Sequence, residues 1–127
     1  GKYRNKKGIS FFTPDDATQQ FGYMKHMKNH IIKPHLHQKR MTKILSTTEV
    51  ILILKGVLRV DFYTSKREYL YSKHLKKNDI IMLVHGGHGF KVIKNVEMLE
   101  IKQGPYSISK DKVKFSNVDE NKIRIKK

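Results

Sequence analysis

A pair of histidines two residues apart is the clearest candidate for metal chemistry in this sequence. His35 and His37 flank a single leucine in the segment 34–37. If this segment is a β-strand, both imidazole rings point to the same side, about 6.6 Å apart along the chain. Neutral imidazole is the commonest side-chain ligand of transition metals, so the two rings can converge on one ion.

A glutamate and a third histidine lie where strands are expected to bury them. Glu49 directly precedes the apolar run 50–54, where a carboxylate is costly to bury unless a cation or hydrogen-bond donors meet it. His88 follows a glycine turn and has the same strand parity as the apolar Phe90 and Val92. Its ring is therefore expected to point inward with theirs.

These residues give the segment 34–102 a resemblance to the cupin family. The first cupin motif is His-x-His, then a Glu, then six residues and a Gly. It is matched by His35, His37, Glu49 and Gly56. The interval between the second histidine and the glutamate is longer than is usual in the family, which predicts an extra loop.

The second cupin motif is similar to the segment 79–88, which has an acidic turn, an apolar strand, a glycine turn and a histidine. The resemblance implies an all-β fold, the double-stranded β-helix or jelly-roll barrel of the cupins. It also implies a divalent metal ion, of which Fe, Mn, Ni and Zn are the candidates. The implied ligands are His35, His37, Glu49 and His88, and the extra loop is expected over 38–46.

Further side chains are candidates for lining a ligand pocket beside this site. For two of them, Met82 and Phe90, core packing is the alternative role. The sequence assigns no catalytic residue. The pocket candidates are Tyr23, Lys25, Met82, Phe90 and Glu100.

Strand-like alternation extends over most of the chain and predicts one domain over 1–127, with terminal arms at 1–8 and 119–127. The run 50–54 is apolar on both faces, so it is expected to be buried on both sides. Lys55 and Gly56 predict a tight hairpin turn into the next strand. Other strands are expected at 21–28, 30–37, 57–63, 69–71, 80–84, 89–93 and 96–102, with a second hairpin turn at 65–67.

The net charge of +16 comes mostly from lysine, because only five of the 27 basic residues are arginine. Sequence-specific recognition of nucleic acid relies on arginine, so no specific nucleic-acid partner is expected, and anionic small molecules are the favoured partners. The absence of cysteine excludes disulfides and thiolate metal sites. With no apolar run long enough for a signal or a membrane span, we expect a cytoplasmic protein without a membrane partner.

The sequence favours a metal-binding protein that binds, isomerises or epimerises a carbohydrate or sugar nucleotide. The ending Gln103-Gly104-Pro105-Tyr106 supports this, because it is similar to that of small cupins in nucleotide-sugar isomerisation. The alternatives are a non-catalytic ligand-binding module, an Fe(II)-dependent dioxygenase and a metal-free sugar pocket. The histidines could also be surface residues, with Glu49 paired to a lysine. A homodimer is expected, because a small barrel covers only the inner face of 50–54.

Overall fold

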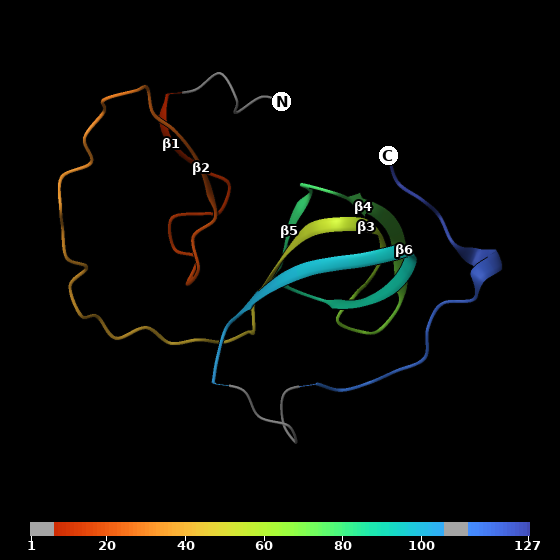
Figure 1. The fold of residues 1–127 in the computed structure, drawn as a ribbon. Coiled ribbons are helices and arrows are strands. Elements are labelled where there is room, and N and C mark those ends of the chain that lie inside the picture. Colours follow the sequence, from red (N-terminus) through yellow and green to blue (C-terminus); the bar gives the residue numbers. More distant parts are fainter. Residues whose placement is uncertain (1–6, 106–111) are drawn as a thin grey trace. The chain divides into compact units, whose positions relative to one another are not determined.

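The computed structural model describes residues 7–105 and 112–127, which form an all-β structure with two antiparallel sheets (Figure 1). The chain divides into two compact units, Gly1–Leu45 and Ser46–Lys127. Among the described residues, no helix is long and apolar enough to cross a membrane. The all-β prediction is confirmed. The strands of these ranges do not close into a barrel, so the jelly-roll barrel and the single domain stay predictions.

The first unit contains one small hairpin. Strand β1 (Gly8–Phe11) pairs antiparallel with β2 (Gly22–Lys25), with Gly8 opposite Lys25. The predicted strand over 21–28 is thus observed in part. The expected strand over 30–37 belongs to neither sheet, and residues 26–45 contain no regular element. Of the predicted arm at 1–8, residues 1–6 lie outside the described residues.

The second unit is built around the 15-residue strand β3 (Glu49–Tyr63). Strand β6 (Gly87–Lys102) pairs antiparallel with β3 along nearly its whole length. On the opposite edge, β5 (Ile80–Leu83) pairs with the first part of β3, and β4 (Tyr69–Lys76) pairs with its second part. The two long strands β3 and β6 curve together through the sheet (Figure 1).

A bend at Gly56 replaces the hairpin predicted there. The residue has the positive φ expected of it, 83°, but the chain continues as one strand because both halves of β3 pair with β6. The pairing register shifts three times between Ile53 and Leu58. A Cβ atom at Gly56 would lie 1.9 Å from the carbonyl oxygen of Asn95, so the two backbones meet where no side chain fits. The two strands predicted at 89–93 and 96–102 are likewise one strand.

The bend gives the second unit a core between the two halves of one sheet. Ile51 and Ile53 from the first half of β3 cluster with Leu58 and Val60 from the second half. Two further buried residues, Leu75 and Leu83, complete the cluster.

The other face of 50–54 is only partly covered, contrary to the sequence prediction. Leu52 is half-buried and Leu54 is exposed, as are Leu99 and Ile101 of the neighbouring β6. The homodimer expected to cover this face stays a prediction.

The C-terminal segment, predicted as a terminal arm over 119–127, extends the same sheet. The N–H of Ser72 donates to the carbonyl oxygen of Arg124, and the N–H of Lys126 donates to that of Ser72, at 2.9 and 2.8 Å. A short 3₁₀ turn, η1 (Glu120–Lys122), precedes this contact. The segment thus occupies the outer edge of β4.

Replacing Gly56 by alanine should strongly destabilise the second unit, because the new methyl group would overlap the backbone of Asn95. We expect a loss of more than about 2 kcal/mol in the free energy of unfolding, since the positive φ alone costs about 1–2 kcal/mol. Urea unfolding measures this loss. Gly8→Ala is the control: its φ of 82° is nearly the same, but nothing lies within 4 Å of the added methyl. Equal losses for the two variants would contradict the close approach at Gly56.

Candidate functional site

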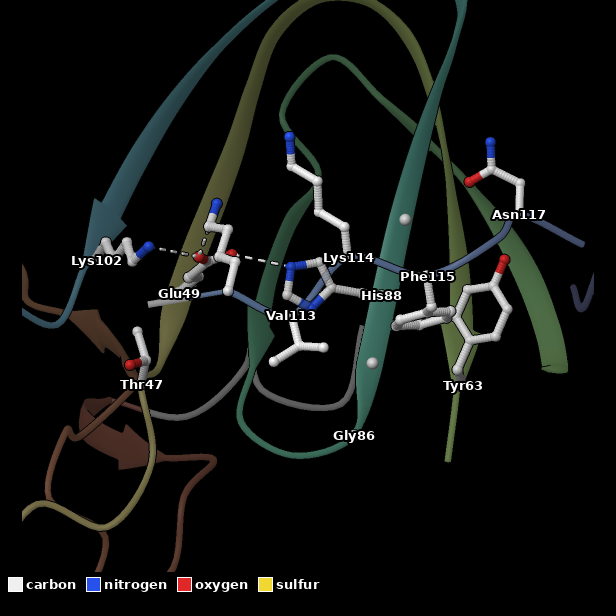
Figure 2. Close-up of a pocket in the computed structure, with 13 residues that line it drawn as sticks. Thr47, Glu49, Tyr63, Gly86, His88, Lys102, Val113, Lys114, Phe115 and Asn117 are labelled. Carbon is white, nitrogen blue, oxygen red and sulfur yellow. Dashed lines mark ion pairs between the residues drawn. The ribbon is translucent and has the colours of Figure 1, made fainter. Parts of the chain in front are cut away.

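The carboxylate of Glu49 is the centre of the candidate site. Glu49 begins β3, and its side chain is only 5% exposed. Its Oε2 lies 3.0 Å from Nε2 of His88, and its Oε1 lies 3.4 Å from Nζ of Lys102. Figure 2 shows the carboxylate between these two side chains. The pair of Glu49 and His88 is therefore a carboxylate and an imidazole held in contact inside the protein.

The bend of β3 explains how these side chains meet. Glu49 is directly opposite Lys102 at one end of the β3–β6 ladder, whereas His88 is opposite Phe62 at the other end. Because β3 folds back at Gly56, its two ends face one another across the core. His88 is half-buried beside Glu49, whereas Phe90 and Val92, which were expected to point inward with it, are exposed. The rings of His88 and Phe90 lie 5.3 Å apart.

One oxygen of this carboxylate is left without a hydrogen bond. Among the described residues nothing donates to Oε2 of Glu49, because the ring of His88 approaches it without the geometry of a hydrogen bond. A buried acceptor without a donor costs about 1–3 kcal/mol. A ligand hydroxyl or a metal ion would satisfy it, which makes this oxygen the most direct sign of a binding site.

A cavity of about 460 Å³ opens beside the carboxylate. Lys112 and Lys114 line it, and Nζ of Lys112 lies 3.8 Å from Oε1 of Glu49. Tyr63 and Phe115 form an aromatic wall, with ring centroids 5.0 Å apart at 86° (Figure 2). The cavity thus combines an aromatic surface with more cationic than anionic groups. Its lining residues are Thr47, Glu49, Tyr63, Gly86, Gly87, His88, Gly89, Lys102, Lys112, Val113, Lys114, Phe115 and Asn117.

An ion-pair network around the buried Arg59 and Asp61 holds the C-terminal wall of the cavity. The guanidinium of Arg59 donates two hydrogen bonds to Asp61 and two to Glu120, at 2.8 and 3.0 Å in each case. Lys91 lies 2.9 Å from Glu120 on the same side, and the hydroxyl of Tyr63 accepts the N–H of Val118 at 3.1 Å. These contacts fix the chain immediately after the wall residues 112–117.

The network shifts two pKa values in opposite directions. Hydrogen bonds from Arg59 and then from Lys91 lower the pKa of Glu120 from 4.5 to about 2. The hydrogen bonds that Arg59 makes to Glu120 and to Asp61 raise the pKa of the guanidinium. Both groups therefore stay charged throughout the physiological pH range.

Of the four ligands that the cupin resemblance implies, the structure brings Glu49 and His88 together. His35 and His37 belong to the first unit, in the irregular segment 26–45, with ring centroids 5.2 Å apart at 76°. Nδ1 of His35 lies 2.9 Å from the carbonyl oxygen of Lys33. No cluster of three or more potential ligands from His, Cys, Asp and Glu is found within the described ranges. The four-ligand metal site stays a prediction.

The predicted pocket residues lie on three strands, β2, β5 and β6. Tyr23 and Lys25 are in β2 of the first unit. Met82 is opposite Val50, on the face away from Glu49, while Phe90 and Glu100 are exposed on β6. Met82, Phe90 and Glu100 do not line the cavity at Glu49.

The wall of the cavity was not predictable from the sequence. Tyr63 and Lys102 lie on strands that were predicted, but their proximity to Glu49 follows from the pairing of β3 with β6. Phe115 and Lys112 are in a segment without periodicity, so no local signal indicated them. Tyr106, the last residue of the sugar-related ending, lies outside the described residues.

Comparison with known proteins adds no relative: no family model, no curated protein and no solved structure matches the chain.

At low pH, protonation of Glu120 should weaken the contacts that hold the C-terminal wall of the cavity. The pKa of this group is lowered by folding, so its contribution to stability is present above about pH 4.5 and is lost as the pH falls toward 2. In Glu120→Gln, the urea midpoint should already be lower at pH 7 and should fall less between pH 5 and pH 2 than in the wild type. Glu97→Gln, which removes an exposed partner of Lys55, is the control and should keep the wild-type pH dependence. If Glu120→Gln also keeps that dependence, the network does not hold the segment.

Proposed function

We propose that the second unit binds an anionic carbohydrate, a sugar phosphate or a sugar nucleotide, and that Glu49 and His88 move a proton in its isomerisation or epimerisation. The observation that carries the proposal is the buried Glu49 carboxylate, whose Oε2 lies 3.0 Å from an imidazole and accepts no hydrogen bond from the residues that the structure describes. A carboxylate and an imidazole in contact are a common pair for general acid–base catalysis.

The charges around the cavity support an anionic ligand. Lys102 lies within 3.4 Å of Glu49, and Lys112 within 3.8 Å. Lys112 and Lys114 also line the cavity, so the single carboxylate of Glu49 faces more than one lysine there. A phosphate or a sugar carboxylate would balance the remaining positive charge, and lysine is a common ligand for phosphate as a point charge.

The aromatic wall supports a sugar or a nucleoside as the rest of the ligand. Tyr63 is buried with its hydroxyl already accepting a hydrogen bond, and Phe115 packs edge-on against it. Such a pair offers a fixed apolar surface beside a polar carboxylate. The C–H face of a pyranose has this amphipathic character, with hydroxyl groups on its rim to reach Oε2 of Glu49.

An isomerisation needs a group that takes a proton from one carbon of the sugar and returns it to the neighbouring carbon. Glu49 is suited to accept that proton, because among the described residues its Oε2 accepts no hydrogen bond. His88 is suited to donate to the sugar carbonyl oxygen or to hold the proton between the two steps, since it is half-buried beside the carboxylate. The non-catalytic alternative uses the same contacts for binding alone.

A divalent metal ion is part of the proposal, as the cupin resemblance implies. The residues fit it in part: the free Oε2 of Glu49 and Nε2 of His88 are both ligand atoms, and they already lie side by side. His35 and His37 would complete the set. When bound, a divalent ion acts as a Lewis acid that polarises a carbonyl oxygen.

The anion contacts can be tested without metal. In EDTA, calorimetric titration with a panel of sugar phosphates and sugar nucleotides should identify a ligand that binds the wild type. Lys112→Ala combined with Lys114→Ala should weaken its binding by at least about tenfold, which corresponds to about 1.4 kcal/mol. Lys66→Ala, in the exposed turn between β3 and β4, is the control and should leave the affinity unchanged. Absence of binding across the panel would refute an anionic sugar ligand.

The metal requirement is tested at Glu49. Glu49→Gln keeps the size of the side chain but removes its negative charge, so the metal content after reconstitution with Fe, Mn, Ni and Zn should fall by a large factor. His35→Ala and His88→Ala should have the same effect, whereas the exposed His74→Ala should have none. A wild-type protein that stays metal-free under these conditions would defeat the metal part alone. Interconversion of the bound sugar, followed by NMR, then separates catalysis from binding.

A further inference from the structure

The segment 26–45 of the first unit exposes large apolar side chains to a degree that is unusual for a folded protein. Leu36 is 94% exposed, Leu45 is 83% exposed and Ile31 is 79% exposed. Figure 1 shows the segment as an open loop without helix or strand between β2 and β3. Loops of this length without regular structure are uncommon and are usually functional or disordered. The exposed apolar side chains of the segment are those of Met27, Ile31, Ile32, Leu36, Met41, Ile44 and Leu45.

The same segment contains several basic residues and no acidic residue. No acidic residue occurs between Asp16 and Glu49, whereas basic residues recur every few positions. One arginine, Arg40, lines a cavity together with Asp15 and Asp16. The basic residues between Asp16 and Glu49 are Lys25, Lys28, Lys33, Lys39, Arg40 and Lys43.

We propose that the segment 26–45 docks on an anionic phospholipid surface. Isolated aliphatic side chains would enter the interface between headgroups and acyl chains, while the lysines between them would remain at the level of the negatively charged headgroups. The electrostatic attraction of several lysines to an anionic leaflet adds to the burial of the apolar groups. The two kinds of side chain alternate along the segment, so both contacts are available to one extended chain.

Two other partners fit the segment less well. A nucleic acid is usually bound through arginine and stacked aromatic residues, but the segment has only one arginine and no Phe, Tyr or Trp. A second copy of the chain would place one acid-free basic segment against another, and like charges would repel. The expectation that the protein has no membrane partner came from the lack of a spanning segment, and docking at the surface needs none.

The proposal goes beyond the function proposed for the second unit and is tested independently of it. The purified protein is sedimented with vesicles of phosphatidylcholine alone and of phosphatidylcholine with 30% phosphatidylserine, as about one lipid in three gives a strongly anionic surface. EDTA is present and sugars are absent, so neither the metal nor the sugar site can influence the result. The wild type should bind the anionic vesicles at least tenfold more tightly than the neutral ones, with a steep decrease as the salt concentration rises.

Two triple variants separate the apolar from the electrostatic contribution. Ile31→Ser, Leu36→Ser and Met41→Ser together should reduce binding to the anionic vesicles at least tenfold, as should Lys33→Gln, Lys39→Gln and Lys43→Gln together. His35 and His37 are left intact. The matched control removes three exposed lysines of the second unit, by the changes Lys66→Gln, Lys77→Gln and Lys94→Gln, and should bind nearly as the wild type does.

Four results would contradict docking of the segment 26–45 on an anionic membrane. Equal losses in the lysine variant and in its control would mean that only the net charge matters, which overturns the assignment to this segment. An apolar variant that binds like the wild type overturns it as well. If the wild type does not bind the vesicles but binds a random RNA, the partner is a nucleic acid. If it does not bind the vesicles but sediments as a dimer, and the apolar variant sediments as a monomer, the partner is a second copy of the chain. Either result refutes the proposal.

Discussion

The carbonyl oxygen of Asn95 lies so close to Gly56 that no side chain fits between the two strands, and the second unit depends on this contact. Here β3 and β6 bend together, and the pairing register shifts on both sides of the bend. A straight ladder would hold Glu49 and Tyr63 at opposite ends of a 15-residue strand. The bend instead turns both ends toward the same cavity. The core at Ile53 and Leu58 and the site at Glu49 are thus consequences of one backbone contact.

The carboxylate of Glu49 can be buried in this geometry only because two lysines and an imidazole accompany it. An isolated charge as little exposed as Glu49 would be neutralised or excluded from the fold, since its desolvation is too costly. Lys102 reaches it from the paired strand, His88 from the far end of the same ladder and Lys112 from the C-terminal wall. Removing any one of these side chains changes both the charge that a ligand meets in the cavity and the cost of burying Glu49. The ligand preference and the stability of this region are therefore linked.

The sequence contained the local features of this arrangement but not the distant ones. The inward direction of His88 and the positive φ of Gly56 were predictable, because strand parity and glycine conformation depend on a few neighbouring residues. The hairpin assigned to Gly56 was wrong because a positive φ does not specify the pairing partner, which here is a strand about 40 residues further along the chain. Similarly, the proximity of Lys102 to Glu49 follows from a register between strands that no local pattern contains.

The C-terminal wall illustrates the limit of pattern-based prediction most clearly. Its residues have no strand or helix periodicity, and Arg59 meets Glu120 across 61 positions of sequence. Yet the feature that holds the wall was visible in part: Arg59 and Asp61 alternate with core residues on β3, where buried charges require partners. Two such charges on one strand face indicate that some other part of the chain must cover them. A charged pair on the outer face of a central strand is therefore a usable sign that a terminal segment packs there, even when the segment itself has no recognisable pattern.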